Sequence, residues 1–269
     1  MPKINSVFLA LSVCFFYSTA SDVNAQVVTP GLKSYNAKYV SLPPTIDGIV
    51  NDSTWSQVNW ENNFEGIEGG SKPSPKLFSQ FKILWDSSNL YIAAYLMEPD
   101  LWATKSKRDD IIYYDNDFEI FLDPNNDGEN YFEFEINALG TLMDLMMTKP
   151  YNKGGTYSLK WNAENIKYAV RPNGTINNNL DIDTGWSIEM AIPFKDFKIG
   201  SRNYLPSLNN PWRLNFSRVE WTLTKQEKSY TKKMNLSNKP IAEYNWVWSP
   251  TGIIDIHVPT KWGNLYFIK

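Results

Sequence analysis

Two seven-residue stretches in the middle of the chain alternate strictly between two kinds of side chain. In residues 117–123 (DFEIFLD), Phe118, Ile120 and Leu122 occupy every second position. Residues 131–137 (YFEFEIN) show the same alternation, and the segment between the two stretches, PNNDGEN, is rich in turn-forming residues. Successive side chains of a β-strand point to opposite faces. The pattern therefore predicts a hairpin of two strands that each bury one face.

Similar signals along the rest of the chain predict an all-β fold. A second hairpin is expected from residues 78–85 and 90–97, which are joined by the turn cluster DSSN. Further strands are expected at residues 166–171, 185–192, 212–221 and 264–268. Helical signals are short and limited to residues 52–58 and 194–197. Many short strands between turn clusters are typical of an antiparallel β-sandwich, and we expect a single domain of this kind.

The N-terminal 25 residues have the pattern of a secretory signal. Lys3 precedes an apolar run over residues 7–17, and residues 23–25 (VNA) resemble a cleavage site for the secretory signal. The run is too short to span a bilayer, which takes about 20 apolar residues. A lipid anchor on Cys14 is the alternative, and we disfavour it because the apolar run continues past that residue. We therefore expect export to the periplasm or the exterior.

We expect the chain after residue 25 to consist of a short leader, residues 26–41, and a single domain, residues 42–269. Cleavage after Ala25 would leave no cysteine, so the domain would not depend on disulfides. It contains no second apolar stretch long enough to cross a membrane. We expect a monomer.

Charge and aromatic content narrow the classes of ligand. The formal net charge is −3, which excludes the broad basic surface that most nucleic-acid-binding proteins need. Aromatic residues make up 15% of the chain, whereas it has one His and one Cys. These counts favour an aromatic binding surface over transition-metal or acid–base chemistry.

The second face of the central hairpin is polar. It carries Glu119, Glu133, Glu135 and Asn137, with aromatic side chains at its edges. A solvated sheet face is one interpretation. The other is a platform that accepts hydrogen bonds from a polyhydroxylated ligand, since hydrogen bonds to carboxylates are stronger than neutral ones.

Several segments, in this order and spacing, resemble the family 9 carbohydrate-binding modules. They are residues 46–48 (IDG) followed by Trp55, 84–86 (LWD) followed by 90–92, 116–124 (NDFEIFLDP), 185–193 (GWSIEMAIP), 212–221, and the run from Trp248 to Leu265. The resemblance extends from about residue 42 to residue 268. It implies an immunoglobulin-like β-sandwich that binds sugars and holds calcium ions structurally.

The resemblance also implies where a sugar binds. Modules of this family hold a terminal sugar between two aromatic rings, and polar side chains contact its hydroxyls. Tyr113 and Tyr114 stand closest to the first ring, where better-known members have Trp. Glu135 stands near a position that is basic in those members. Trp246 or Trp248, followed by His257, would supply the second ring.

The tryptophans divide into two groups by their surroundings. Trp85, Trp186 and Trp212 lie in apolar strands and are expected in the core, and Trp55 and Trp262 are expected to pack as well. Five others lie at strand ends or in polar loops, where exposed rings would mark a binding surface: Trp102, Trp161, Trp221, Trp246 and Trp248. We predict that the saccharide site is formed by Trp102, Tyr113, Tyr114, Glu119, Glu135, Trp161, Trp248 and His257.

Residues 123–128 (DPNNDG) resemble the start of a calcium loop. Asp123, Asn125 and Asp127 offer oxygen ligands at alternate positions, and Gly occupies the sixth. Phe134 at the twelfth position excludes an EF-hand. An ordinary hairpin turn explains the segment equally well, so calcium is a hypothesis here.

The sequence lacks the motifs of the common hydrolases and nucleotide-binding enzymes. We therefore expect non-catalytic saccharide binding that supports polysaccharide breakdown or uptake. Three alternatives stay open. Glu119 and Glu135 could act as the carboxylate pair of a glycoside hydrolase, and His257 could bind haem together with one of the methionines. The chain could also be a structural or partner-binding surface protein without a sugar ligand.

Overall fold

The computed structural model describes residues 31–70 and 74–269, and in these ranges the regular structure is β-strand with a few 3-10 turns and no α-helix. The strands are β1 (Ser34–Tyr39), β2 (Glu65–Gly66), β3 (Ser79–Trp85), β4 (Asn89–Leu96), β5 (Asp117–Asp123), β6 (Tyr131–Asn137), β7 (Leu142–Met147), β8 (Tyr157–Ser158), β9 (Lys167–Asn173), β10 (Gly185–Pro193), β11 (Lys198–Ile199), β12 (Arg202–Asn203), β13 (Trp212–Glu220), β14 (Leu223–Gln226), β15 (Ser229–Lys232), β16 (Tyr244–Val247) and β17 (Gly263–Ile268). The 3-10 turns are η1 (Ser53–Gln57), η2 (Ile112–Tyr114), η3 (Tyr151–Lys153), η4 (Phe194–Asp196) and η5 (Pro259–Lys261). The all-β fold is thus confirmed.

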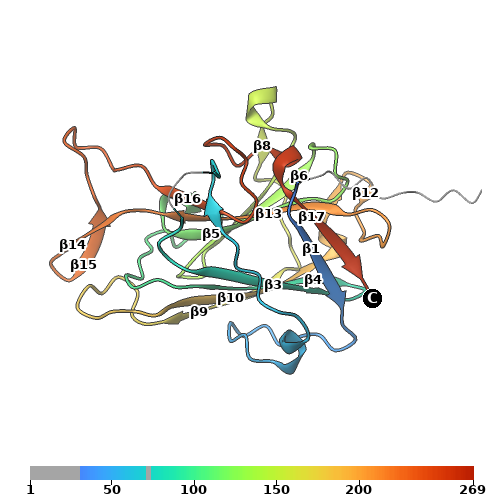
Figure 1. The fold of residues 1–269 in the computed structure, drawn as a ribbon, viewed down its shortest axis with the longest axis horizontal. Coiled ribbons are helices and arrows are strands. Elements are labelled where there is room, and N and C mark those ends of the chain that lie inside the picture. The colour runs from blue at the N-terminus through green and yellow to red at the C-terminus, as the bar shows by residue number, and fades with distance from the viewer. Residues whose placement is uncertain (1–30, 71–73) are drawn as a thin grey trace, which may run out of the picture.

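Most strands belong to one sheet that curls into two layers (Figure 1). Strands β8, β7, β6, β5 and β13 follow one another in one layer, and β3, β4, β10 and β9 form the other. The link between the layers is β1, which pairs in parallel with β17 on one side and with β3 on the other. The sheet is therefore continuous, with two parallel pairings that the expected antiparallel arrangement did not include. The hairpin β14–β15 projects from one end of the molecule.

Both predicted hairpins are confirmed. Strands β5 and β6 have the predicted bounds. Strand β3 begins one residue later than predicted, and β4 begins and ends one residue earlier. The strands expected around β9, β10, β13 and β17 are present as well. The two short helical signals are single 3-10 turns, η1 and η4.

The main core lies between the two layers. From β5 it receives Phe118, Ile120 and Leu122, the side chains that the alternation assigns to one face. Trp186 and Trp212 meet them from β10 and β13, as predicted. The opposite face of β5 and β6 is consequently turned away from the main core, and it is on this face that the candidate site lies.

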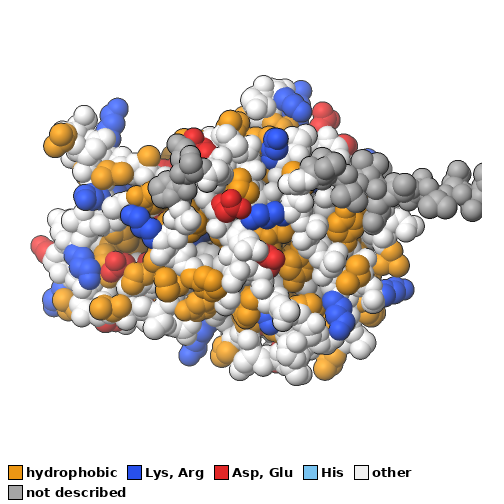
Figure 2. All heavy atoms as spheres, viewed as in Figure 1, with side chains coloured by type: hydrophobic (Ala, Val, Ile, Leu, Met, Phe, Trp, Pro, Cys, Tyr) orange, Lys and Arg blue, Asp and Glu red, His pale blue; other side chains and the backbone are white. Residues whose placement is uncertain are grey.

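The N-terminal boundary differs from the predicted one. Strand β1 lies within the segment assigned to a leader, residues 26–41, yet it pairs with both β17 and β3. The domain therefore begins no later than Ser34. The predicted signal, residues 1–25, lies outside the described residues. No helix in the described ranges is long and apolar enough to cross a membrane. On the face shown in Figure 2, side chains of both charge signs are interspersed.

Candidate functional site

Two paired strands bring a row of carboxylates to one place. Glu119 on β5 lies directly opposite Glu135 on β6, and Glu133 is two residues away on the same face. On its other side Glu119 is paired with Ser217 of β13. The three glutamates are buried, although the sequence alone also allowed a solvated face. Strand register thus places them together as a polar floor.

A cavity of about 540 Å³ lies over this floor. That volume is within the range of about 300–1,000 Å³ usual for small-ligand sites. Its walls include the rings of Tyr113, Tyr151, Tyr157 and His257. The three tyrosines are 37%, 47% and 54% exposed, so part of each ring is accessible to a ligand. Carboxylates and aromatic faces therefore line one cavity.

The backbone of Tyr113 is held at the cavity by two hydrogen bonds. Its N–H donates to Glu135 Oε2 at 2.9 Å, and its carbonyl accepts from Trp221 Nε1 at 2.9 Å. The Tyr114 ring packs beside the Tyr113 ring, with centroids 4.5 Å apart. Segment η2 is therefore fixed relative to the carboxylate floor.

His257 is a neutral part of the wall. Its Nδ1 lies 3.0 Å from the Tyr131 hydroxyl, and its ring meets the edge of Tyr151 at a centroid distance of 4.8 Å. Burial lowers the pKa of His257 to about 4. The imidazole is therefore uncharged at neutral pH and acts as a packing and hydrogen-bonding group.

The Asp, Glu, Lys and Arg side chains that line the cavity are all of the acidic kind. The described residues that line it include Glu119, Glu133, Glu135, Glu243 and Asp255 but neither Lys nor Arg. Burial, together with neighbouring carboxylates, raises the pKa of Glu119 and of Glu133 to about 8, and raises the pKa of Glu135 well above its usual range. A ligand that donates hydrogen bonds, or that brings positive charge, is favoured here.

Four of the eight predicted site residues line the cavity: Tyr113, Glu119, Glu135 and His257. Tyr114 is an immediate neighbour. Whether any of these residues contacts a sugar stays a prediction.

The other three predicted residues, all tryptophans, lie elsewhere, and the prediction for them is corrected. Trp248 is buried in the main core against Phe81. Trp161 packs on Phe132 from the core side of β6, and Trp102 is buried in a cluster with Trp221. Trp221 and Trp246, also expected to be exposed, are buried as well. Polar neighbours in the sequence suggested exposure, but the strands and loops that cover these rings come from distant segments.

Sequence reasoning did not select several residues of the cavity. Glu133 carries the same alternation signal as Glu135 and could have been chosen from it. After β7, Tyr151 begins the 3-10 turn η3 and Tyr157 lies in the two-residue strand β8, whereas Glu243 and Asp255 lie in loops. No periodic pattern in the sequence marks the last four residues, because only the folded chain brings them over the carboxylate floor of the cavity.

The proposed calcium turn has its carboxylate tied to its own backbone. Asp123 accepts hydrogen bonds from the N–H groups of Asn126 at 3.0 Å and Gly128 at 2.8 Å. Asp127 accepts from the N–H of Glu129 and from the Asn125 side chain. The Asn125 Oδ1 atom, however, is buried and has no hydrogen-bond partner. The oxygen donors and this unpaired atom fit a hard cation such as Ca²⁺.

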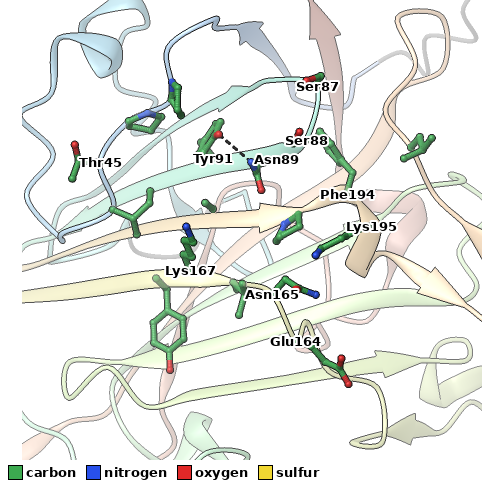
Figure 3. A pocket seen from close by; sticks show the side chains of 18 of the residues that line it. Thr45, Ser87, Ser88, Asn89, Tyr91, Glu164, Asn165, Lys167, Phe194 and Lys195 are labelled. Carbon is green, nitrogen blue, oxygen red and sulfur yellow. Dashed lines mark hydrogen bonds between the residues drawn. The ribbon is translucent and has the colours of Figure 1, made fainter.

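A wider hollow of about 1410 Å³ lies on the other layer, along β4, β9, β10 and η4 (Figure 3). Its side chains are already engaged or spread apart. Tyr91 donates its hydroxyl proton to Asp86 at 2.6 Å, and Asn165 donates to Asp196 at 2.8 Å. The Tyr91 and Phe194 rings are buried, so they offer little surface for stacking. None of the predicted site residues lines this hollow, and we take the smaller cavity as the candidate site.

Comparison with solved structures shows the fold. A protein of Bacteroides uniformis described as carbohydrate-binding superposes with a TM-score of 0.61 at 19% identity, covering 88% of this chain and 99% of that one. A carbohydrate-binding module of family 9 from Caldicellulosiruptor kristjanssonii, in complex with cellotriose, gives a TM-score of 0.52 at 18% identity over 87% and 93% of the two chains. The same module with glucose gives 0.51 at 18% identity, over 88% and 96%.

Sequence comparison gives a relative and a family. Endo-1,4-beta-xylanase A of Thermotoga neapolitana is 27% identical over 168 residues, which cover 62% of this chain but only 14% of the xylanase. Residues 46–245 match the family described as carbohydrate family 9 binding domain-like. This match spans most of the chain, and the protein therefore belongs to that family.

Proposed function

We propose that this protein is an exported monomer that binds a saccharide without cleaving it and thereby supports polysaccharide breakdown or uptake. One observation carries the proposal. In a member of a carbohydrate-binding family, buried carboxylates and partly exposed tyrosine rings line the same cavity of about 540 Å³. The similar fold of a module that holds cellotriose or glucose supports the same class of ligand.

The cavity offers the two kinds of contact that a sugar ring needs. The C–H faces of a pyranose are apolar and suit the partly exposed faces of Tyr113 and Tyr151. Its hydroxyls can exchange hydrogen bonds with the carboxyl groups of Glu119 and Glu133 on the floor, whose oxygens accept in either protonation state. We therefore place the sugar between the tyrosines and the floor of β5 and β6.

Loss of either tyrosine ring is expected to weaken sugar binding while the fold persists. Tyr113→Ala and Tyr151→Ala should each reduce affinity by about 1–3 kcal/mol, or roughly tenfold to hundredfold, as for other buried aromatic contacts. The ligand would first be identified on a glycan array, and affinities then measured by calorimetry. Tyr266→Ala, on β17 and outside the cavity, is the matched control. Full affinity in both cavity variants would show that the site lies elsewhere.

Binding without cleavage is tested by incubating the protein with glucans, xylans and mannans. We expect no reducing sugar above background, because the family consists of binding modules. Product formation that Glu119→Gln abolishes would instead identify a hydrolase that uses the paired carboxylates.

We also propose that the turn of Asp123, Asn125 and Asp127 holds a calcium ion that stabilises the β5–β6 hairpin. Chelation should then lower the melting temperature, because an ion that binds only the folded state stabilises it, by about 2.7 kcal/mol at 100 times its Kd. This corresponds to roughly 5–10 °C for a domain of this size. The fall should shrink in Asp127→Asn but not in Glu227→Gln, an exposed control. An equal fall in both variants would leave the segment as an ordinary turn.

A further inference from the structure

Three carboxylates converge at the inner end of the cavity. Asp117, Glu119 and Glu135 each place one oxygen within 4.8 Å of the others, and all three side chains are buried. Asp117 precedes Glu119 by two residues on the same face of β5, and Glu119 is paired with Glu135 on β6. The sheet register therefore fixes their positions. Glu119 and Glu135 line the cavity, whereas Asp117 is not among its lining residues.

Asp117 has an oxygen that the protein leaves without a partner. Its Oδ1 accepts a hydrogen bond from the Val219 N–H at 3.3 Å, whereas its Oδ2 is buried with no hydrogen-bond partner. The side chain is only 1% exposed. An unsatisfied buried acceptor costs about 1–3 kcal/mol, and a charged one more. This oxygen is therefore available to a group that is not part of the chain.

Two cationic side chains, one on β13 and one on the separate hairpin β14–β15, are engaged elsewhere. Arg218 of β13 forms ion pairs with Glu98 and Glu220, both at 2.9 Å. Lys232 of β15 lies over the Trp221 ring, with its Nζ 3.3 Å from the ring centroid. A buried carboxyl group is stabilised by a paired cation or a metal ion, or it is neutralised by a proton. A bound cation would provide that stabilisation here.

We propose that Asp117, Glu119 and Glu135 bind a calcium ion at the inner end of the cavity. Ca²⁺ binds carboxylate oxygens at about 2.3–2.6 Å, so two ligands on opposite sides of it lie about 4.6–5.2 Å apart. The three oxygens all lie within 4.8 Å of one another, close enough for one Ca²⁺ to contact all three. Mg²⁺ is disfavoured because it demands near-ideal octahedral geometry and gives up its water ligands reluctantly, whereas Ca²⁺ accepts irregular sets of carboxylate oxygens. A set made only of carboxylates also disfavours the softer transition metals.

The ion would have free positions toward the cavity. Ca²⁺ takes about 6–8 oxygen ligands, so three single contacts leave about three to five positions for water or for the hydroxyls of a ligand. Two adjacent hydroxyls of a sugar can fill two of them. This second role rests on the proposed saccharide binding, whereas the ion site itself does not.

Calcium binding is tested by calorimetry on protein freed of metal, with CaCl₂ as the probe. Asp117→Asn and Glu119→Gln should each bind one Ca²⁺ fewer than the unaltered protein, or bind that ion at least tenfold more weakly. Asp127→Asn, which alters the separate turn, should keep the site. The Asp127→Asn variant should also give Tb³⁺ emission sensitised by nearby tyrosine, and Ca²⁺ should displace the Tb³⁺. The Tb³⁺ measurement therefore tests ion binding in a protein whose three proposed ligands are unaltered.

The outcomes separate the ion site from the sugar site. Absence of Ca²⁺ binding and of Tb³⁺ emission in Asp127→Asn would overturn the ion site, as would unchanged binding in Asp117→Asn and Glu119→Gln. Sugar affinity should fall at least tenfold in chelator and recover with Ca²⁺. Unchanged sugar affinity in chelator would overturn the role of the ion in sugar binding. If no sugar binds in either condition, the proposed function fails, and the calcium measurements still decide the ion site.

Discussion

Trp248→Ala is expected to lower the free energy of unfolding by about 3–5 kcal/mol, the usual cost of removing a large buried ring. Trp248 is 1% exposed and meets Phe81 edge to face at a centroid distance of 5.6 Å. Its backbone N–H donates to the Phe216 carbonyl at 2.9 Å, which fixes the residue between the layers. Truncation would leave a cavity that the surrounding strands can fill only in part.

The close approach of Gly263 to the same ring provides a second test. A Cβ atom on Gly263 would lie 2.3 Å from Cζ3 of Trp248, so Gly263→Ala should also destabilise the domain. The double variant should cost less than the two single costs combined, because without the indole the added methyl loses its closest clash. Contact with the Lys33 carbonyl, at 2.9 Å, would retain part of the cost.

Urea unfolding followed by circular dichroism measures these costs. Leu205→Ala, at a side chain that is 62% exposed, is the control and should change stability by no more than about 0.5 kcal/mol. A loss below about 1 kcal/mol in Trp248→Ala would contradict the core position. Sugar affinity in the folded fraction should be retained, because Trp248 does not line the cavity.

The strands that could be predicted from sequence are those with a strong local pattern. Alternation gave the bounds of β5 and β6, since each has one face in the main core. Strand β7 (LMDLMM) lacks alternation and was not predicted. Strand β1 was assigned to a leader, because its role is to pair with β17 and β3 at distant positions of the chain. Such long-range pairing leaves no local signal.

The residues of the candidate site likewise fall into those that a local sequence pattern predicts and those that it does not. The period of two placed Glu119 and Glu135 on one face, and the structure brings them to one cavity floor. The burial of Trp248 could not be predicted, because Phe81, which packs against its ring, lies far away in the sequence. Tyr151 enters the cavity wall from the three-residue 3-10 turn η3, which is too short for a periodic pattern to show where its side chains point.

Arg218→Met is expected to destabilise the domain by about 3–5 kcal/mol at pH 8, as when one partner of a buried ion pair is removed, and by less at pH 5. Arg218 Nη2 lies 2.9 Å from an oxygen of Glu98 and 2.9 Å from an oxygen of Glu220, and all three side chains are buried. Methionine preserves much of the apolar stem but removes the charge. Two buried carboxylates would then face each other without a cation.

The pH dependence follows from the direction of the pKa shifts. Burial raises the pKa of Glu98 and of Glu220 above the ordinary value, and the Arg218 charge opposes that rise. A carboxyl group with a higher pKa in the folded state costs stability as the pH rises above its unfolded pKa of about 4.3, since ionisation is harder when it is buried. Loss of Arg218 raises both pKa values further, so the penalty should grow from pH 5 to pH 8.

Urea unfolding at the two pH values measures the difference, and the double variant Arg218→Met, Glu220→Gln should regain stability at pH 8. An equal loss at both pH values would mean that packing, not charge, is the cause.

The hydrogen-bond network around Arg218 also fixes the backbone of Tyr113 in the cavity wall. Asn116 donates to Glu220 at 2.9 Å and accepts from the Trp221 N–H at 2.8 Å, and Trp221 in turn holds the Tyr113 carbonyl. Arg218→Met should therefore weaken sugar binding even where it remains folded, because the ring of Tyr113 is positioned through this chain of contacts.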